Sequence, residues 1–337
     1  MRSFCDSPFT NMTIRPDGHV FVCCAAWTNA YSLGNAFSQS FEQIWNSPKA
    51  QALRASIHDG SFRHCIANRC GRLAEGELSS DAMFEKNAKL IERKSVVMES
   101  GPSKLTLNYD PSCNLACRSC RTELVFSNSD EITKLIAFQE TVLTSSYFKN
   151  VKRIQATGTG DVFASKVYEH FLNKISFDKF PDLRLELRTN GILLTPKKWD
   201  SISNTHYAID LIIISIDAAT ENTYEYVRGK GFEKLVANLE YLGQVKKSAD
   251  FRLEIWFVMQ VANYREIPDF VRLGKRINAD RVNFTRLRNW GTYSNFAKED
   301  IFDVNHPQHQ DYLNIMQDPI LNDPIVQVRH SPSMGDE

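Results

Sequence analysis

Residues 105–120 read LTLNYDPSCNLACRSC, and this stretch decides how the rest of the chain is interpreted. It opens with a short β-rich run, Leu105–Asn108, and continues into a polar segment that carries three closely spaced cysteines. Five more β-rich runs follow downstream, and polar or glycine-rich residues come after each of them. These further expected strands are Val151–Ala156, Leu183–Leu187, Leu211–Ile216, Leu253–Met259 and Arg281–Phe284.

Helical patterns separate the expected strands. They include Glu131–Val142, Val167–Ile175, Phe232–Leu242 and Ile267–Ile277. Six β-α units in succession predict an α/β fold with a parallel sheet and right-handed crossovers, which an open sheet or a partial barrel would satisfy. In β-α barrels the carboxyl ends of the strands carry the active site, so the polar residues after all six runs are candidate site residues.

The composition excludes several classes of protein. Of the 337 residues, 42% are hydrophobic and 24% are charged, which is typical of a folded chain of about two domains. The 40 basic and 40 acidic residues balance, which argues against a non-specific nucleic-acid binder. The longest nearly apolar run, 211–216, is far shorter than the ~18 residues of a membrane span. Because the first ten residues lack the apolar core of a signal peptide, we expect a cytoplasmic protein.

All eight cysteines lie within the first 120 residues, and the remaining 217 residues contain none. Without a signal peptide, reduced thiols that bind metal are a better interpretation than disulfides. The cysteines are Cys5, Cys23, Cys24, Cys65, Cys70, Cys113, Cys117 and Cys120.

The N-terminal segment is expected to form a small cysteine-rich domain. Thr10–Ile14 and His19–Cys23 are expected to be strands of a hairpin, because Pro16 and Gly18 suit the turn between them. Helices are expected to begin after Ser40, which has capping-box spacing to Gln43, and after Ser47. The expected organisation is a cysteine-rich domain at 1–75, a linker or connecting helix at 76–102, the β-α core at 103–290 and a C-terminal extension at 291–337.

The cysteine run after the first strand has the spacing C-x3-C-x2-C, from Cys113 through Cys117 to Cys120. Three thiolates on one loop can hold three corners of a [4Fe–4S] cluster and leave the fourth iron free for another ligand. The alternative is a zinc site, which would need a fourth ligand, and no histidine lies within 30 residues of Cys120.

This spacing resembles the radical S-adenosylmethionine (SAM) superfamily, and the resemblance extends over residues 103–290. Thr157–Asp161 is similar to the superfamily's glycine-acid motif, while Thr189-Asn190-Gly191 and Ser215-Ile216-Asp217 fall where relatives carry a TNG and an S-x-D motif. Arg228 lies where an arginine often follows. One departure is Ser119, which replaces the aromatic residue that many members carry before the last cysteine. The resemblance implies a partial (β/α)6 TIM-like barrel.

The resemblance also implies a cofactor and a chemistry. SAM would chelate the open iron, and one electron from a reductant such as flavodoxin or ferredoxin would cleave SAM to methionine and a 5′-deoxyadenosyl radical. That radical would abstract hydrogen from the substrate. The residues implied to contact SAM are Gly158, Gly160, Asp161, Asn190, Ser215, Asp217 and Arg228. As an alternative, the glycines only form the turn after their strand, and Ser215 or Asp217 caps the next helix.

The other cysteines resemble the opening of the SPASM and twitch auxiliary-cluster domains, over residues 5–70. Cys5, Gly18 and Cys23 fit C-x12-G-x4-C, and Cys65 and Cys70 follow with C-x4-C spacing. Here the domain precedes the core, whereas it normally follows it. The resemblance implies one auxiliary [4Fe–4S] cluster on Cys5, Cys23, Cys65 and Cys70, with a structural zinc on the same thiolates as the alternative. Cys24 is then spare, because adjacent strand residues point to opposite faces.

We therefore expect a radical SAM oxidoreductase whose auxiliary cluster relays electrons. Peptide maturation and sugar or alcohol oxidation are the leading substrate classes, and no catalytic side chain is assigned. The alternatives are a non-catalytic iron–sulfur or SAM-binding regulator and a zinc-stabilised interaction protein.

Overall fold

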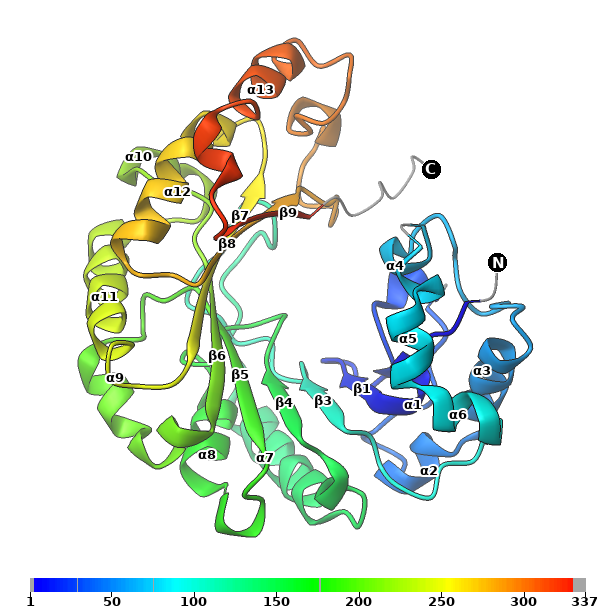
Figure 1. Ribbon diagram of the computed structural model, residues 1–337. Coiled ribbons are helices and arrows are strands. Elements are labelled where there is room, and N and C mark those ends of the chain that lie inside the picture. The colour runs from blue at the N-terminus through cyan, green and yellow to red at the C-terminus, as the bar shows by residue number, and fades with distance from the viewer. Residues whose placement is uncertain (1–2, 29, 75, 176, 330–337) are drawn as a thin grey trace.

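The computed structural model describes residues 3–329 except 29, 75 and 176. In this part of the chain nine strands form a single curved sheet in the order β2-β1-β3-β4-β5-β6-β7-β8-β9. Helices cover the outer face of the curve, so the sheet forms an incomplete barrel (Figure 1). Residues 330–337 of the expected C-terminal extension lie outside the described residues.

The six expected core strands all form, and neighbours along the chain pair in parallel. Their bounds are β3 (Lys104–Leu107), β4 (Arg153–Ala156), β5 (Arg184–Thr189), β6 (Ile209–Ser215), β7 (Arg252–Met259) and β8 (Arg281–Arg286). The side chains that pack between these strands and the helices are apolar; Ile212 and Ile214 of β6, for example, are completely buried. The expected α/β fold with a parallel sheet is therefore confirmed.

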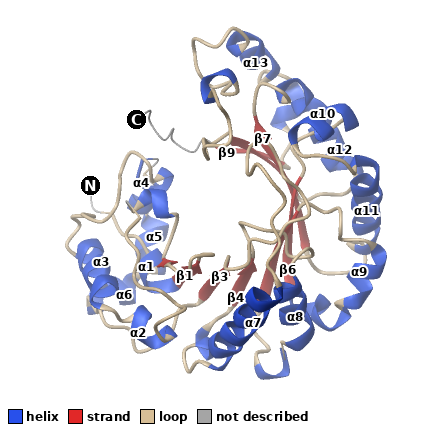
Figure 2. Cartoon of the chain, turned by 180° about the vertical axis from the view of Figure 1, so that it is seen from behind, coloured by secondary structure: helices blue, strands red, loops and turns tan. Residues whose placement is uncertain are grey.

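The helices that follow these strands lie on the convex side of the sheet (Figure 2). They are α7 (Ser129–Thr144), α8 (Lys166–Lys174), α9 (Pro196–Ser201), α10 (Glu221–Val227), α11 (Phe232–Val245) and α12 (Ile267–Arg276). Local signals place their starts: Asn128 and Glu131 form a capping box on α7, and the Ser165 side chain caps α8. Short 3-10 turns lie between the regular elements at η3 (Phe148–Asn150), η4 (Phe177–Lys179), η5 (Ser203–Ala208) and η6 (Tyr264–Glu266).

The expected N-terminal hairpin forms, and it also joins the barrel sheet. β1 (Asn11–Ile14) pairs antiparallel with β2 (Val20–Phe21), and its other edge pairs in parallel with β3. The local turn signal predicts the hairpin but contains no information about the β1–β3 pairing, which joins residues about 90 positions apart. The cysteine-rich segment is thus attached to the barrel through backbone hydrogen bonds.

The remaining N-terminal elements are helical. They are α1 (Ser7–Thr10), η1 (Ala25–Trp27), α2 (Phe41–Trp45), α3 (Pro48–His58), α4 (Gly71–Ala74), η2 (Glu77–Ser79), α5 (Asp81–Lys86) and α6 (Ala88–Arg93). The expected capping box of Ser40 and Gln43 and the expected cap at Ser47 are both present. Residues of the expected linker pack on this segment, as Phe4 N donates to Leu78 O at 2.9 Å.

The expected C-terminal extension folds back onto the barrel. It contains η7 (Phe296–Lys298), α13 (His309–Ile315), η8 (Pro319–Asn322) and β9 (Val326–Arg329). β9 was not predicted; it pairs in parallel with β8 and extends the sheet beyond the six core strands.

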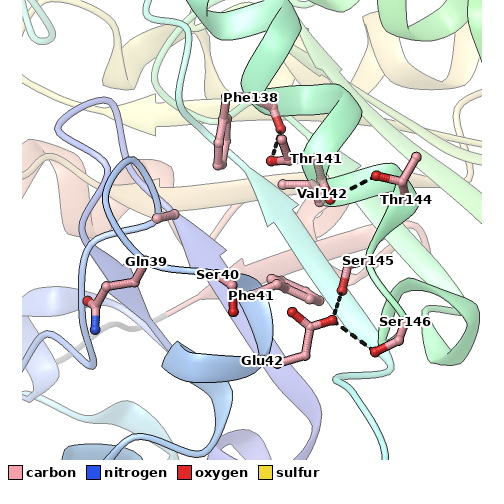
Figure 3. A pocket seen from close by; sticks show the side chains of 11 residues that line it. Gln39, Ser40, Phe41, Glu42, Phe138, Thr141, Val142, Thr144, Ser145 and Ser146 are labelled. Carbon is pink, nitrogen blue, oxygen red and sulfur yellow. Dashed lines mark hydrogen bonds between the residues drawn. The ribbon is translucent and has the colours of Figure 1, made fainter.

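A second contact joins the N-terminal segment to the barrel beside α7. Ser145 Oγ and Ser146 Oγ donate to the same oxygen of Glu42, at 2.7 and 2.9 Å. The pocket above this contact is lined by residues from both parts of the chain, among them Phe41 and Phe138 (Figure 3). The Glu42 bonds thus support the attachment that β1 provides.

Arg54 of α3 is a buried hub of the N-terminal segment. Its guanidinium donates to the carbonyl oxygens of Pro8, Trp45 and Val96 at 2.8–2.9 Å and lies 4.5 Å from the centre of the Trp45 ring. Burial lowers the pKa of Arg54 to about 10, so the side chain stays charged at neutral pH.

We expect Arg54→Met to lower the free energy of unfolding by about 3 kcal/mol or more, because three buried carbonyl groups lose a charged donor. Chemical denaturation of the purified chain measures the change. Arg272→Met on the outside of α12, where the exposed side chain pairs with Asp269, is the control and should change stability by less than about 0.5 kcal/mol. Equal effects of the two substitutions would contradict the assignment of Arg54 as a hub.

Candidate functional site

The Cys113–Cys120 loop begins directly after β3, at the carboxyl end of the parallel strands. Cys113 N donates to Val125 O at 2.8 Å, and Cys120 N donates to Cys117 O at 2.9 Å. Cys113 and Cys117 are buried, whereas Cys120 is exposed. The loop therefore presents its thiols between the strand ends and solvent.

A buried carboxylate anchors the start of this loop. Asp110 accepts hydrogen bonds from Ser112 N at 3.0 Å and from the hydroxyls of Ser112, Ser127 and Ser165. This role of Asp110 was not predicted from the sequence, in which a polar residue after a strand was the available signal. The bonds connect the loop to α8 and to the segment before α7.

The glycine-rich turn after β4 packs against the same loop. A Cβ atom on Gly160 would lie 2.6 Å from Ser112 O, so only glycine fits at this close approach of two backbone segments. A Cβ on Gly158 would lie 3.0 Å from Asn108 Oδ1, a tight contact with a side-chain atom that can move more easily than backbone. The closest neighbours of both glycines are therefore protein atoms of the β3 end.

Asp161 connects the ends of β4 and β5. One of its oxygens accepts from Thr189 Oγ1 at 2.8 Å and Asn190 N at 2.6 Å, and the other accepts from Phe163 N at 2.9 Å. Burial raises the pKa of Asp161, although the hydrogen bonds from Asn190 and Thr189 oppose that shift. These protein partners account for the buried carboxylate by themselves, and the expected contact with a SAM amino group stays a prediction.

Asn190 connects the TNG segment to the cysteine loop. Its Nδ2 lies 2.9 Å from Asn114 Oδ1 and 3.9 Å from Cys113 Sγ, while its Oδ1 accepts from Ile192 N at 3.1 Å. The glycine-rich turn, the TNG segment and the cysteine loop thus form one contiguous cluster of contacts.

Asp217 and Arg228 form a buried ion pair at the end of β6. Their Oδ2 and Nη1 atoms are 2.8 Å apart, and the other Asp217 oxygen accepts from Val258 N at 2.7 Å. Asp217 has a φ of +63°, which is uncommon for a residue other than glycine. Ser215, the last residue of β6, is half-buried nearby along the chain. Two of the residues implied to contact SAM therefore contact one another.

In the N-terminal segment, Cys5, Cys23, Cys65 and Cys70 line one small cavity, together with Arg72 and apolar side chains. Burial and then the neighbouring thiols Cys5 and Cys70 raise the pKa of Cys65 to about 12. Burial is also the largest cause of the raised pKa of Cys23. The structure thus brings the four cysteines of the expected auxiliary site together.

Cys24 does not line that cavity, for a reason other than the one expected. β2 ends at Phe21, so Cys23 and Cys24 follow the strand and strand alternation does not separate their side chains. Cys24 instead directly precedes the 3-10 turn η1.

The comparisons with known proteins agree with this division of the chain. A family model described as "Radical SAM superfamily" matches residues 107–274, and one described as "Iron-sulfur cluster-binding domain", SPASM, matches residues 5–71. The protein belongs to the radical SAM superfamily. It carries an N-terminal SPASM domain, and its cofactors are a SAM-binding [4Fe–4S] cluster and an auxiliary iron–sulfur cluster.

Several solved structures are similar to the chain in fold. SuiB from Streptococcus suis is 14% identical and has a TM-score of 0.49, with 98% of this chain and 72% of that chain covered. The structure of the same protein bound to the precursor peptide SuiA is 12% identical and has a TM-score of 0.49, with 98% of this chain and 73% of that chain covered. A radical SAM methyltransferase from Sphaerobacter thermophilus is 14% identical and has a TM-score of 0.41, with 65% of this chain and 64% of that chain covered. No curated protein gives a significant match.

Buried donors beside Cys117 fit a radical SAM cluster in the loop. Within the described chain, Arg228 Nε and the Tyr224 hydroxyl are buried and have no hydrogen-bond partner. Burial alone would lower the pKa of Arg228, but the negative charges of Cys117 and Asp217 outweigh it and raise the pKa. Buried donors without an acceptor are rare in proteins, and an anionic cluster or a SAM carboxylate would supply one. Tyr224 was not predicted from the sequence, because an aromatic residue on a helix has no distinctive pattern.

Burial raises the pKa of Cys117 to about 11, against the opposing charge of Arg228. Binding of a metal by this thiol would require that it lose its proton. The four N-terminal cysteines share a cavity, but no three or more His, Cys, Asp or Glu side chains among the described residues are arranged so that they could hold one metal ion. The same residues form no helix long and apolar enough to cross a membrane.

We expect Asp161→Asn to lower the free energy of unfolding by about 2 kcal/mol without SAM, because an amide group would face the N–H and O–H donors that the carboxylate now accepts. Denaturant unfolding of the apo chain measures the loss. Asp200→Asn, at an exposed position of α9, is the control and should have little effect. If Asp161→Asn weakened SAM binding but left the stability of the apo chain unchanged, the structural assignment of Asp161 would be wrong.

Proposed function

We propose that this radical SAM enzyme holds its SAM cluster on Cys113, Cys117 and Cys120 and its auxiliary cluster on Cys5, Cys23, Cys65 and Cys70. The observation that carries this proposal is the cavity that the four N-terminal cysteines share while Cys24 stays outside it. The contacts of Asn190 and Gly160 with the other loop support the first set.

We further propose that the enzyme oxidises its substrate, with a peptide or a sugar or alcohol as the substrate class. Four protein thiolates around the auxiliary site would occupy all four irons of a cube, so that no iron is open for substrate. This favours electron transfer over substrate binding at that site. A flavodoxin or ferredoxin is the proposed reductant.

When bound, the SAM cluster supplies the electron that cleaves SAM to methionine and a 5′-deoxyadenosyl radical. The residues of the chain would bind the cluster and SAM and hold them in position. The buried Arg228 guanidinium, held by Asp217, offers its unpartnered Nε to an acceptor beside Cys117. Asn190 orients the Cys113 end of the loop, and the Asp110 bonds keep the loop in register with the strand ends. We propose that Gly158 and Ser215 line the SAM site from the ends of β4 and β6.

Metal content tests the two ligand sets separately. We expect about eight irons and eight sulfides per reconstituted chain, because each four-iron cluster carries four of each. Replacing Cys113, Cys117 and Cys120 together with Ala should leave about half of the iron. Full iron in that variant would contradict the assigned SAM cluster, and zinc in place of the remaining iron would contradict the auxiliary one.

The two sites should also differ in what their loss does to the reaction. We expect Cys65→Ala to impair substrate turnover while SAM is still cleaved, because Cys65 lies in the SPASM domain, outside the SAM loop. Cys117→Ala should abolish cleavage, since the SAM cluster would lose a ligand. The measurement is 5′-deoxyadenosine formed by each reconstituted variant, with iron content determined in parallel.

Cys24→Ala is the matched control, because Cys24 lies next to a proposed ligand but outside the cavity. It should retain both clusters and full activity. Robust SAM cleavage by Cys117→Ala would refute the proposed SAM site, and loss of iron in Cys24→Ala would refute the proposed auxiliary ligand set.

A further inference from the structure

One cation shares the auxiliary cavity with the four cysteines. Arg72 lies in α4, two residues after Cys70, and its side chain lines the cavity. Its Nη1 atom is 3.9 Å from Cys5 Sγ, within the range of a hydrogen bond to sulfur. About a quarter of the Arg72 side chain is exposed, so the guanidinium is only partly shielded from water.

Other contacts hold the guanidinium in this position. Nη1 also lies 3.3 Å from Asp6 Oδ1 and 3.1 Å from Ser7 Oγ, and Nε donates to Glu77 Oε1 at 2.9 Å. Because guanidinium is planar, the contacts of Nε with Glu77 and of Nη1 with Asp6 and Ser7 fix the plane of the group, and the same Nη1 atom faces Cys5 Sγ. Arg72 therefore approaches Cys5 with a set orientation.

A second cation belongs to the same ionic network, because it pairs with the other carboxylate oxygen of Asp6. Lys86 Nζ lies 2.7 Å from Asp6 Oδ2. Burial raises the pKa of Asp6, but the hydrogen bonds and charges of Lys86 and Arg72 lower it by more, so the pKa of Asp6 is lowered overall. Lys86 donates no hydrogen bond to a sulfur atom of the described residues, so the two cations can be compared as one that contacts a thiol and one that does not.

We propose that Arg72 is a positioning residue that donates a hydrogen bond to the Cys5 thiolate and thereby raises the reduction potential of the auxiliary cluster. This inference rests on the ligand set proposed above. Reduction adds negative charge to the cluster and its sulfurs, and a charged donor stabilises the reduced form more than the oxidised form.

A raised potential suits an electron acceptor. In the proposed oxidation the substrate radical would lose one electron to the auxiliary cluster and one proton to solvent. A one-electron carrier of the flavodoxin class then removes the electron, so the cluster returns to its oxidised form. Arg72 thus favours the direction of electron flow from substrate to cluster.

The test is a potentiometric titration of the full-length reconstituted enzyme, followed by electron paramagnetic resonance. The auxiliary signal is identified as the one that persists when Cys113, Cys117 and Cys120 are replaced with Ala. We expect Arg72→Gln to reduce the ratio of reduced to oxidised auxiliary cluster about tenfold at a given potential, a shift of about 59 mV to more negative values. Lys86→Gln is the matched control, and it should shift the potential much less.

Arg72→Lys separates charge from geometry and covers the case in which Arg72→Gln fails to load a cluster. Arg72→Lys should shift the potential in the same direction by a smaller amount, because the positive charge remains while the planar guanidinium group is lost. If Arg72→Gln loads a cluster, equal shifts for Arg72→Gln and Lys86→Gln would overturn the inference. If it does not, equal potentials for wild type and Arg72→Lys would overturn it. A wild-type chain that holds no auxiliary iron would instead refute the proposed ligand set.

Discussion

The parallel pairing of β1 with β3 is the constraint on which the rest of the structure depends. It makes the N-terminal hairpin an edge of the barrel sheet, so the SPASM cysteines and the SAM loop belong to one hydrogen-bonded framework. The loop leaves β3 at its carboxyl end, and the chain that leads to Cys23 leaves β1 after Ile14. Two functional segments that are remote in sequence are therefore placed by neighbouring strands.

Close backbone packing sets the SAM loop in position. Asp110, Gly160 and Asp161 each use protein contacts to hold the ends of β3, β4 and β5 together. The result is a site whose shape is set by contacts within the chain itself, while Arg228 Nε and the Tyr224 hydroxyl are buried donors without a partner in the described chain. Positions fixed by such contacts reduce the reorganisation that binding and electron transfer require.

Local patterns in the sequence predict the parts of this account that are local in the structure. The six core strands and the caps at Ser40 and Ser47 follow from periodicity and from residues within a few positions of one another. The resemblance of the motifs led to the two cysteine sets. The β1–β3 pairing and β9 could not be predicted in this way, because strand pairing over long separations leaves no local signal. Asp110, Tyr224 and Arg72 were missed for the same reason: their roles come from neighbours that only the fold supplies.

The central claim is that one chain carries two separate four-iron clusters, on Cys113, Cys117 and Cys120 and on Cys5, Cys23, Cys65 and Cys70. Native mass spectrometry of the anaerobically reconstituted wild-type chain tests it most directly, because the intact mass counts clusters on each molecule. The account predicts a dominant species with the mass of the chain plus two [4Fe–4S] clusters. A dominant species with one cluster, or with one cluster and a zinc ion, would contradict it.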